Sequence, residues 1–124
     1  MRVTSAEHAA SSHLWFVTVT VAGDVVDAQI IRSGLERLSH EHPFLLSGRY
    51  AADRAEVRYW EEGPTAQSVL NLAVGLWSEH RESAGLPEWD VVGVEVIDRE
   101  TFHRRGRHLG QGPGLIAAGG VSPL

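Results

Sequence analysis

Histidine is the residue type in this chain that most directly suggests chemistry, because imidazole acts as a metal ligand and as an acid–base group near neutral pH. The sequence holds seven histidines, and two of them, His40 and His42, stand on either side of Glu41. Two histidines at this spacing chelate a metal on a strand, where residues two apart point the same way. This pair instead precedes Pro43 at the predicted end of a helix, where residues two apart diverge. We therefore expect helix-end histidines that complement the helix dipole.

A wider metal site depends on how the chain folds. The topology inferred below brings four histidines and two glutamates to one end of the domain: His13, His40, His42, His103, Glu61 and Glu62. Three converging histidines with an open position would match zinc or non-haem iron centres. Unless these histidines converge, we predict that the protein binds no metal and no cofactor. His80 is expected at the other end of its helix, as a half-buried histidine with satisfied ring nitrogens.

The other residue patterns in the sequence do not match a catalytic or phosphate-binding motif. Cysteine is absent, which removes disulfides, thiol nucleophiles and cysteine-ligated metals. The glycines from Gly110 to Gly114 resemble a phosphate loop, but they lack the Lys-Ser/Thr pair and the flanking strand and helix. Ser11 and Ser12 beside His13 make no catalytic triad, because sequence neighbours in a leader have no fixed geometry.

Alternating apolar and polar residues predict four strands, over residues 13–22, 44–50, 55–62 and 89–98. On the last strand we expect Val92, Val94 and Val96 to share the buried face. Trp89 should anchor this strand, and Trp15 should meet Trp77 in the core.

Helical spacing of apolar residues predicts two helices. The first is expected to be capped by Asp24 and to run to about Ser39, with Gly34 allowing close packing. The second is expected from Ala66 to Ala84, ended by Gly85 and the proline that follows.

The resulting order, strand-helix-strand-strand-helix-strand, resembles the ferredoxin-like split βαβ arrangement. The resemblance implies an α+β fold: a four-stranded antiparallel sheet in spatial order 4-1-3-2, with two helices on one face. It covers residues 13–101. We interpret residues 1–12 as a flexible leader and residues 102–124 as a basic, then Gly/Pro-rich, flexible tail.

The second face of the sheet is the candidate binding surface, because its residue types suit neither water nor a core. It is predicted to combine aromatic, hydroxyl and charged side chains, among them Phe16, Thr18, Arg49, Arg58, Trp60 and Glu95. Three interpretations compete: pairing with a second copy, an open or tail-covered surface, and a ligand-binding face. Phe16 and Trp60 occupy strands on which an RNA-recognition domain stacks bases, but the Gly-aromatic pattern is missing.

The distribution of charge along the chain limits the classes of partner that we expect. All sixteen acidic residues lie at or before Glu100, whereas Arg104, Arg105 and Arg107 follow it. The acidic body disfavours nucleic acid, and the basic run suits an acidic partner. The sequence shows no signal peptide or membrane span, so we expect a cytoplasmic protein. Arginine without lysine, among many Ala, Gly and Val, is typical of GC-rich bacterial genomes.

We therefore expect a small binding or regulatory module, dimeric through its open sheet face, and not an enzyme. One alternative is a small dimeric α+β enzyme with a pocket at the sheet face. The other is an adaptor that works through its basic C-terminal segment.

Overall fold

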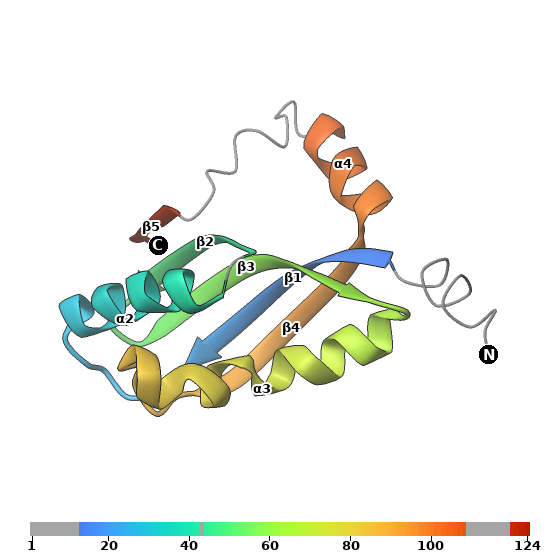
Figure 1. Ribbon diagram of the computed structural model, residues 1–124. Helices are drawn as coiled ribbons and strands as arrows, with labels where there is room; N and C mark the ends of the chain where they lie inside the picture. Colours follow the sequence, from blue (N-terminus) through green and yellow to red (C-terminus); the bar gives the residue numbers. More distant parts are fainter. Residues whose placement is uncertain (1–12, 43, 109–119) are drawn as a thin grey trace, which may run out of the picture.

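The computed structural model describes residues 13–42, 44–108 and 120–124. These residues form an α+β domain with a mixed sheet (Figure 1). The strands are β1 (His13–Ala22), β2 (Leu45–Ala51), β3 (Arg54–Gly63), β4 (Asp90–Asp98) and β5 (Gly120–Pro123). The helices are α2 (Ala28–Glu41), α3 (Ala66–Ala84) and α4 (Arg99–His108). No helix in these ranges is long and apolar enough to cross a membrane.

The sheet has the order β4-β1-β3-β2-β5, so the predicted 4-1-3-2 core is present with one strand added. The four-stranded, wholly antiparallel sheet was wrong, because β5 pairs in parallel with β2 along residues 47–50. The prediction of a flexible segment from residue 102 also differs from the structure. Residues 99–108 form α4 and residues 120–123 form β5. The leader, residues 1–12, lies outside the described residues, as do residues 109–119.

The main core lies between the sheet and the helix pair α2 and α3 (Figure 1). Val17, Val19 and Val21 of the central strand β1 are almost completely buried there, since alternate residues of a strand point to one face. Val57 and Tyr59 of β3 point into the same layer. α4 lies on the other side of the sheet, away from α2 and α3 (Figure 1).

Local capping sets the helix ends. α2 is capped by Asp27, whose carboxylate accepts a hydrogen bond from the Gln29 backbone N–H at 2.9 Å, and not by Asp24 as predicted. α3 begins with a reciprocal cap between Thr65 and Ser68 and ends at Gly85, which has φ of 73°. That left-handed conformation favours glycine and confirms the predicted stop.

The predicted alternation of buried and exposed side chains failed at the start of β4, where Val91, expected on the outer face, packs against the main core and Val92 is exposed. The pairing with β1 shifts between Thr20 and Val21, which face Gly93 and Val91. Val92 is therefore an extra residue in a β-bulge, and its side chain is 63% exposed. Val94 and Val96 do pack against the core, as expected.

Tryptophan side chains form hydrogen bonds and a stacking contact that hold the loop before β4 in place. Trp89 donates its indole N–H to the Asp24 carbonyl at 2.9 Å and stacks on Trp77, with ring planes 4° apart. Trp77 donates in turn to the Pro87 carbonyl. The expected contact partner of Trp77 was Trp15, but Trp15 instead donates its indole N–H to the Gly63 carbonyl.

We predict that Gly23→Ala lowers the free energy of unfolding by about 1–3 kcal/mol, the usual cost of overpacking. The added methyl group would overlap the Trp89 ring. Gly75→Ala is the matched control, because a Cβ at Gly75 in α3 meets no atom within 4 Å. It should raise stability by about 0.5–1 kcal/mol. Urea unfolding measures both, and equal stabilities of the two variants would refute the packing role of Gly23.

Candidate functional site

The candidate surface is the sheet face away from α2 and α3, here called the outer face. The β1–β3 register places Phe16 opposite Trp60, Thr18 opposite Arg58, and Thr20 opposite Glu56. Neighbouring strands extend these rows with residues on the same face. Ile97, Glu95 and Gly93 come from β4, where Gly93 adds backbone only, and Ser47 and Arg49 come from β2. All six residues predicted for this face therefore lie on it, from four adjacent strands.

The rows of Thr18 and Thr20 form the polar part of the outer face, which α4 reaches through the ion pair between Arg105 and Glu95. Arg58 lies 3.3 Å from Glu56 across an ion pair, and about a third of the Arg58 side chain is exposed. Arg49 is exposed and stands opposite Glu56 in the register. The Glu56 oxygen of the ion pair, Oε1, is buried and makes no hydrogen bond beyond that ion pair, and Arg58 Nε is buried without a hydrogen-bond partner among the described residues. Buried polar atoms are normally hydrogen-bonded, so the pair is incompletely satisfied within the described chain.

The other end of the outer face is aromatic and covered. Phe16 and Trp60 contact each other with ring centroids 5.2 Å apart, and Phe102 of α4 lies on both. Phe16 and Phe102 are buried, so the sequence missed a second small core on this face.

A signal for α4 exists in the sequence. Asp98 accepts a hydrogen bond from the Thr101 backbone N–H at 2.7 Å, as a helix cap does. Hydrogen bonds from the Thr101 side chain and backbone lower the pKa of Asp98. Arg105 of the same helix pairs with Glu95 at 3.1 Å.

The four histidines of the predicted metal site do not converge. His13 lies against Trp15, His40 contacts the Glu36 carbonyl within α2, and His103 packs beside Phe102. Within residues 13–42, 44–108 and 120–124, no group of three or more His, Asp or Glu side chains has metal-binding geometry. His13 shares a hollow of about 660 Å³ with Glu62, at the start of β1.

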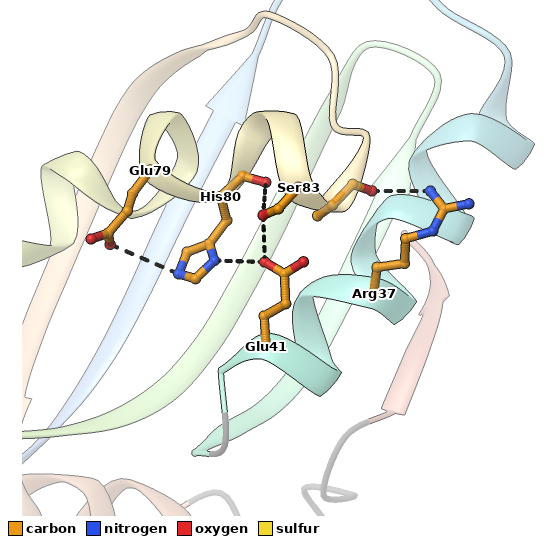
Figure 2. A network of polar contacts seen from close by, with 6 residues as sticks. Arg37, Glu41, Glu79, His80 and Ser83 are labelled. Atoms are coloured by element: carbon orange, nitrogen blue, oxygen red, sulfur yellow. Dashed lines mark hydrogen bonds and ion pairs between the residues drawn. The ribbon is translucent and has the colours of Figure 1, made fainter.

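A different polar cluster joins the two helices (Figure 2). Glu41 at the end of α2 accepts hydrogen bonds from His80 Nδ1 and from Ser83 Oγ of α3, each at 2.8 Å. Glu79 lies 3.8 Å from the other ring nitrogen of His80. Arg37, one turn before Glu41, donates to the Ala84 carbonyl at 3.1 Å. The expectation that His80 lies apart from the end of α2 was therefore wrong.

His42 extends this cluster toward the core. Its ring packs on Tyr59, with centroids 4.7 Å apart, and lies 6.3 Å from the His80 ring. Burial lowers the pKa of His42, and the neighbouring His80 lowers it further. The hydrogen bond from His80, followed by that from Ser83, lowers the pKa of Glu41. Burial raises the pKa of Glu61, which lies near Tyr59.

The cluster fixes the helix pair more readily than it supports catalysis. A hydroxyl nucleophile needs a hydrogen bond to a base, but Ser83 donates to Glu41 and not to His80. The hydrogen bond to Glu41 orients the His80 ring, as a carboxylate orients an acid–base histidine. Nothing in the cluster supplies an electrophilic group or a backbone N–H pair directed at a substrate.

Comparison with known proteins places the chain in a family. A family model described as a domain of unknown function (DUF8830) matches residues 14–112, so the chain belongs to that family. The match includes β1 through α4. No curated protein sequence matches the chain.

We predict that His42 makes the fold sensitive to mild acid. Its pKa is lower in the folded state than the ordinary value of about 6.5, so folding favours the neutral ring. The neutral His42 ring stabilises the fold fully at pH values above about 6.5, and this stabilisation is lost as the pH falls below about 6.5. His42→Phe keeps a ring on Tyr59 without a titrating group. Urea unfolding at pH 7.5 and 5.5 should therefore show a smaller loss for the variant than for the wild type.

Titration of Glu41 and Asp98 affects the stability of the fold in a different pH range from titration of His42. Both carboxyls have lowered pKa values, so they destabilise the fold only at more acidic pH, below the ordinary value of about 4. An identical loss between pH 7.5 and 5.5 in wild type and His42→Phe would show that His42 is not the sensitive group.

Proposed function

We propose that this DUF8830 domain is a non-enzymatic binding module that associates with a second copy of itself through the polar part of its outer face. The first support for the proposal comes from which parts of the sheet the helices cover. α2 and α3 cover one side of the sheet, while on the other side α4 covers the aromatic end. In the rows of Thr18 and Thr20, the side chains that come from the central strands β1 and β3 are partly exposed.

The observation that carries the proposal is the ion pair of Arg58 and Glu56, which lies in the polar rows and keeps parts of both side chains exposed. Glu56 Oε1 lies 3.3 Å from Arg58 Nη2, while Arg58 Nε has no hydrogen-bond partner among the described residues. A partner that brings a carboxylate and a guanidinium to the exposed parts of this pair would add charge-assisted hydrogen bonds. Hydrogen bonds to charged groups of this kind are the stronger ones, worth about 1.5–3 kcal/mol each.

A second copy fits this requirement because the surface carries both charge signs. In a two-fold interface the same patch faces itself, so Arg49 and Arg58 of one copy can meet Glu56 of the other. We interpret β1-α2-β2-β3-α3-β4 as a ferredoxin-like core, and domains of that kind commonly pair through their sheets. Complementary charge fixes the register of such a pair and speeds its formation.

The enzyme alternative rests on the Glu41–His80 hydrogen bond, which orients a histidine as acid–base catalysis requires. It would place chemistry at the helix pair, away from the sheet face. The adaptor alternative rests on the basic α4, but Arg105 pairs with Glu95 and Arg104 with Thr101. The side chain of Arg107 lies outside the described residues.

We predict that Arg58→Glu and Arg49→Glu each weaken self-association about tenfold or more, equivalent to roughly 1.4 kcal/mol. Each variant sets like charges against Glu56 within the chain and across the interface. Sedimentation equilibrium over a micromolar concentration range measures the association constant. Arg32→Glu is the control, because Arg32 is an exposed side chain on α2 paired with Glu36.

The proposal fails if the wild-type chain remains monomeric throughout that range. It also fails if both sheet variants associate as tightly as Arg32→Glu does. Urea unfolding of each variant confirms that a weaker association constant reflects the surface and not loss of the fold.

A further inference from the structure

α4 covers the aromatic end of the outer face through one side chain. The ring of Phe102 lies 4.5 Å from that of Phe16 and 4.9 Å from that of Trp60, measured between centroids. Phe102 and Phe16 are 8% and 5% exposed. Neither belongs to the main core under α2 and α3. The three rings therefore form a separate cluster, and α4 contributes one of its members.

The remaining contacts of α4 are weak by physical criteria. Arg105 pairs with Glu95, but both side chains are more than half exposed, and exposed ion pairs contribute little to stability. Phe102 is the only buried residue among residues 99–106, the part of α4 whose side chains the structure describes. A ten-residue helix is too short to be stable alone in water. Docking of α4 therefore depends mainly on one phenyl ring.

The surface under Phe102 is continuous with the polar part of the outer face. Phe16 and Trp60 are opposite each other in the register, and the next row in the same direction is Thr18 and Arg58. Large aromatic side chains are the usual anchors of protein interfaces, and each buries about 150–250 Å². The two polar rows hold eight residues, fewer than the roughly 20–30 on each side of a standard interface, so alone they suit a weak association. Adding Phe16 and Trp60 to the contact would strengthen that association.

We propose that α4 is a displaceable cap over an aromatic docking site for a second copy of this chain. In the closed state Phe102 occupies the position between Phe16 and Trp60. In the open state these two rings join the polar rows, and apolar side chains of the second copy's outer face take the place of Phe102. α4 thereby sets the strength of self-association. The inference rests on the proposed function, whose interface it extends and regulates.

Hydrogen exchange of the full chain tests the cap without reference to any partner. Amides of α4 should exchange faster than those of β1 and β3, because helices with few buried contacts open locally. Phe102→Ala should accelerate exchange in α4 by about tenfold or more while leaving β1 and β3 unchanged. Arg105→Glu, which repels Glu95 but keeps Phe102, should produce a smaller acceleration. Protection of α4 equal to that of β1, or acceleration throughout the domain in Phe102→Ala, would overturn the cap.

Sedimentation equilibrium of the same variants tests its consequence. Phe102→Ala should strengthen self-association by about tenfold, since the aromatic site is then free for the second copy. Leu72→Ala is the control, because Leu72 is an exposed apolar residue on α3 and its loss should leave the association constant unchanged.

The two proposals fail in different ways. If Phe102→Ala opens α4 without strengthening association, while Arg58→Glu still weakens it, the cap is wrong and the polar interface stands. If neither variant changes the association constant, the polar interface itself is wrong, and the cap fails with it.

Discussion

The alternation of side chains along β1 is the constraint on which the rest of the structure depends. β1 pairs with β3 on one side and β4 on the other, so each of its residues fixes the face of two neighbours. Val17, Val19 and Val21 are buried under α2 and α3, which leaves the residues between them for the outer face. A one-residue slip would exchange the two sets and place threonine and phenylalanine in the wrong layers. The candidate interface is therefore a direct consequence of how the main core is packed.

The two faces differ in how completely they are covered. On the helix side, α2 packs tightly against the end of α3 and the loop that follows it: a Cβ at Gly34 would lie 2.6 Å from a Leu86 methyl carbon and 3.3 Å from the Ala84 carbonyl oxygen. The Glu41–His80–Ser83 cluster joins the C-terminal ends of the two helices. On the outer side, one ring of α4 covers two aromatic residues, and α4 reaches the polar rows through the exposed ion pair between Arg105 and Glu95. This asymmetry is the reason why we propose the outer face, and not the helix side, as the binding surface.

The sequence was sufficient where a long periodic pattern and the main core agree, as in β1 and α3, whose ends match the predicted ones. It was insufficient where one residue or a short segment decides. α4 has a single buried apolar side chain and so shows no helical stripe, and β5 is a four-residue strand containing glycine and proline. The β-bulge at Val92 exchanged the expected faces of Val91 and Val92, which the alternating residue pattern did not predict. His80 was misplaced because strand order does not determine how far α2 and α3 are offset along each other, and Glu41 meets α3 near its C-terminal end, at His80 and Ser83. Six residues of the outer face were predictable from period two alone, but the cap over two of them was not.

The central claim is that the polar rows of the outer face are where this domain meets a second copy. Amide correlation spectra of the ¹⁵N-labelled chain over a dilution series test it residue by residue. We expect concentration-dependent shifts at Thr18, Arg58 and Arg49, with the resonances of α2 and α3 unchanged. Spectra that do not change with concentration, or shifts confined to α2 and α3, would contradict the account.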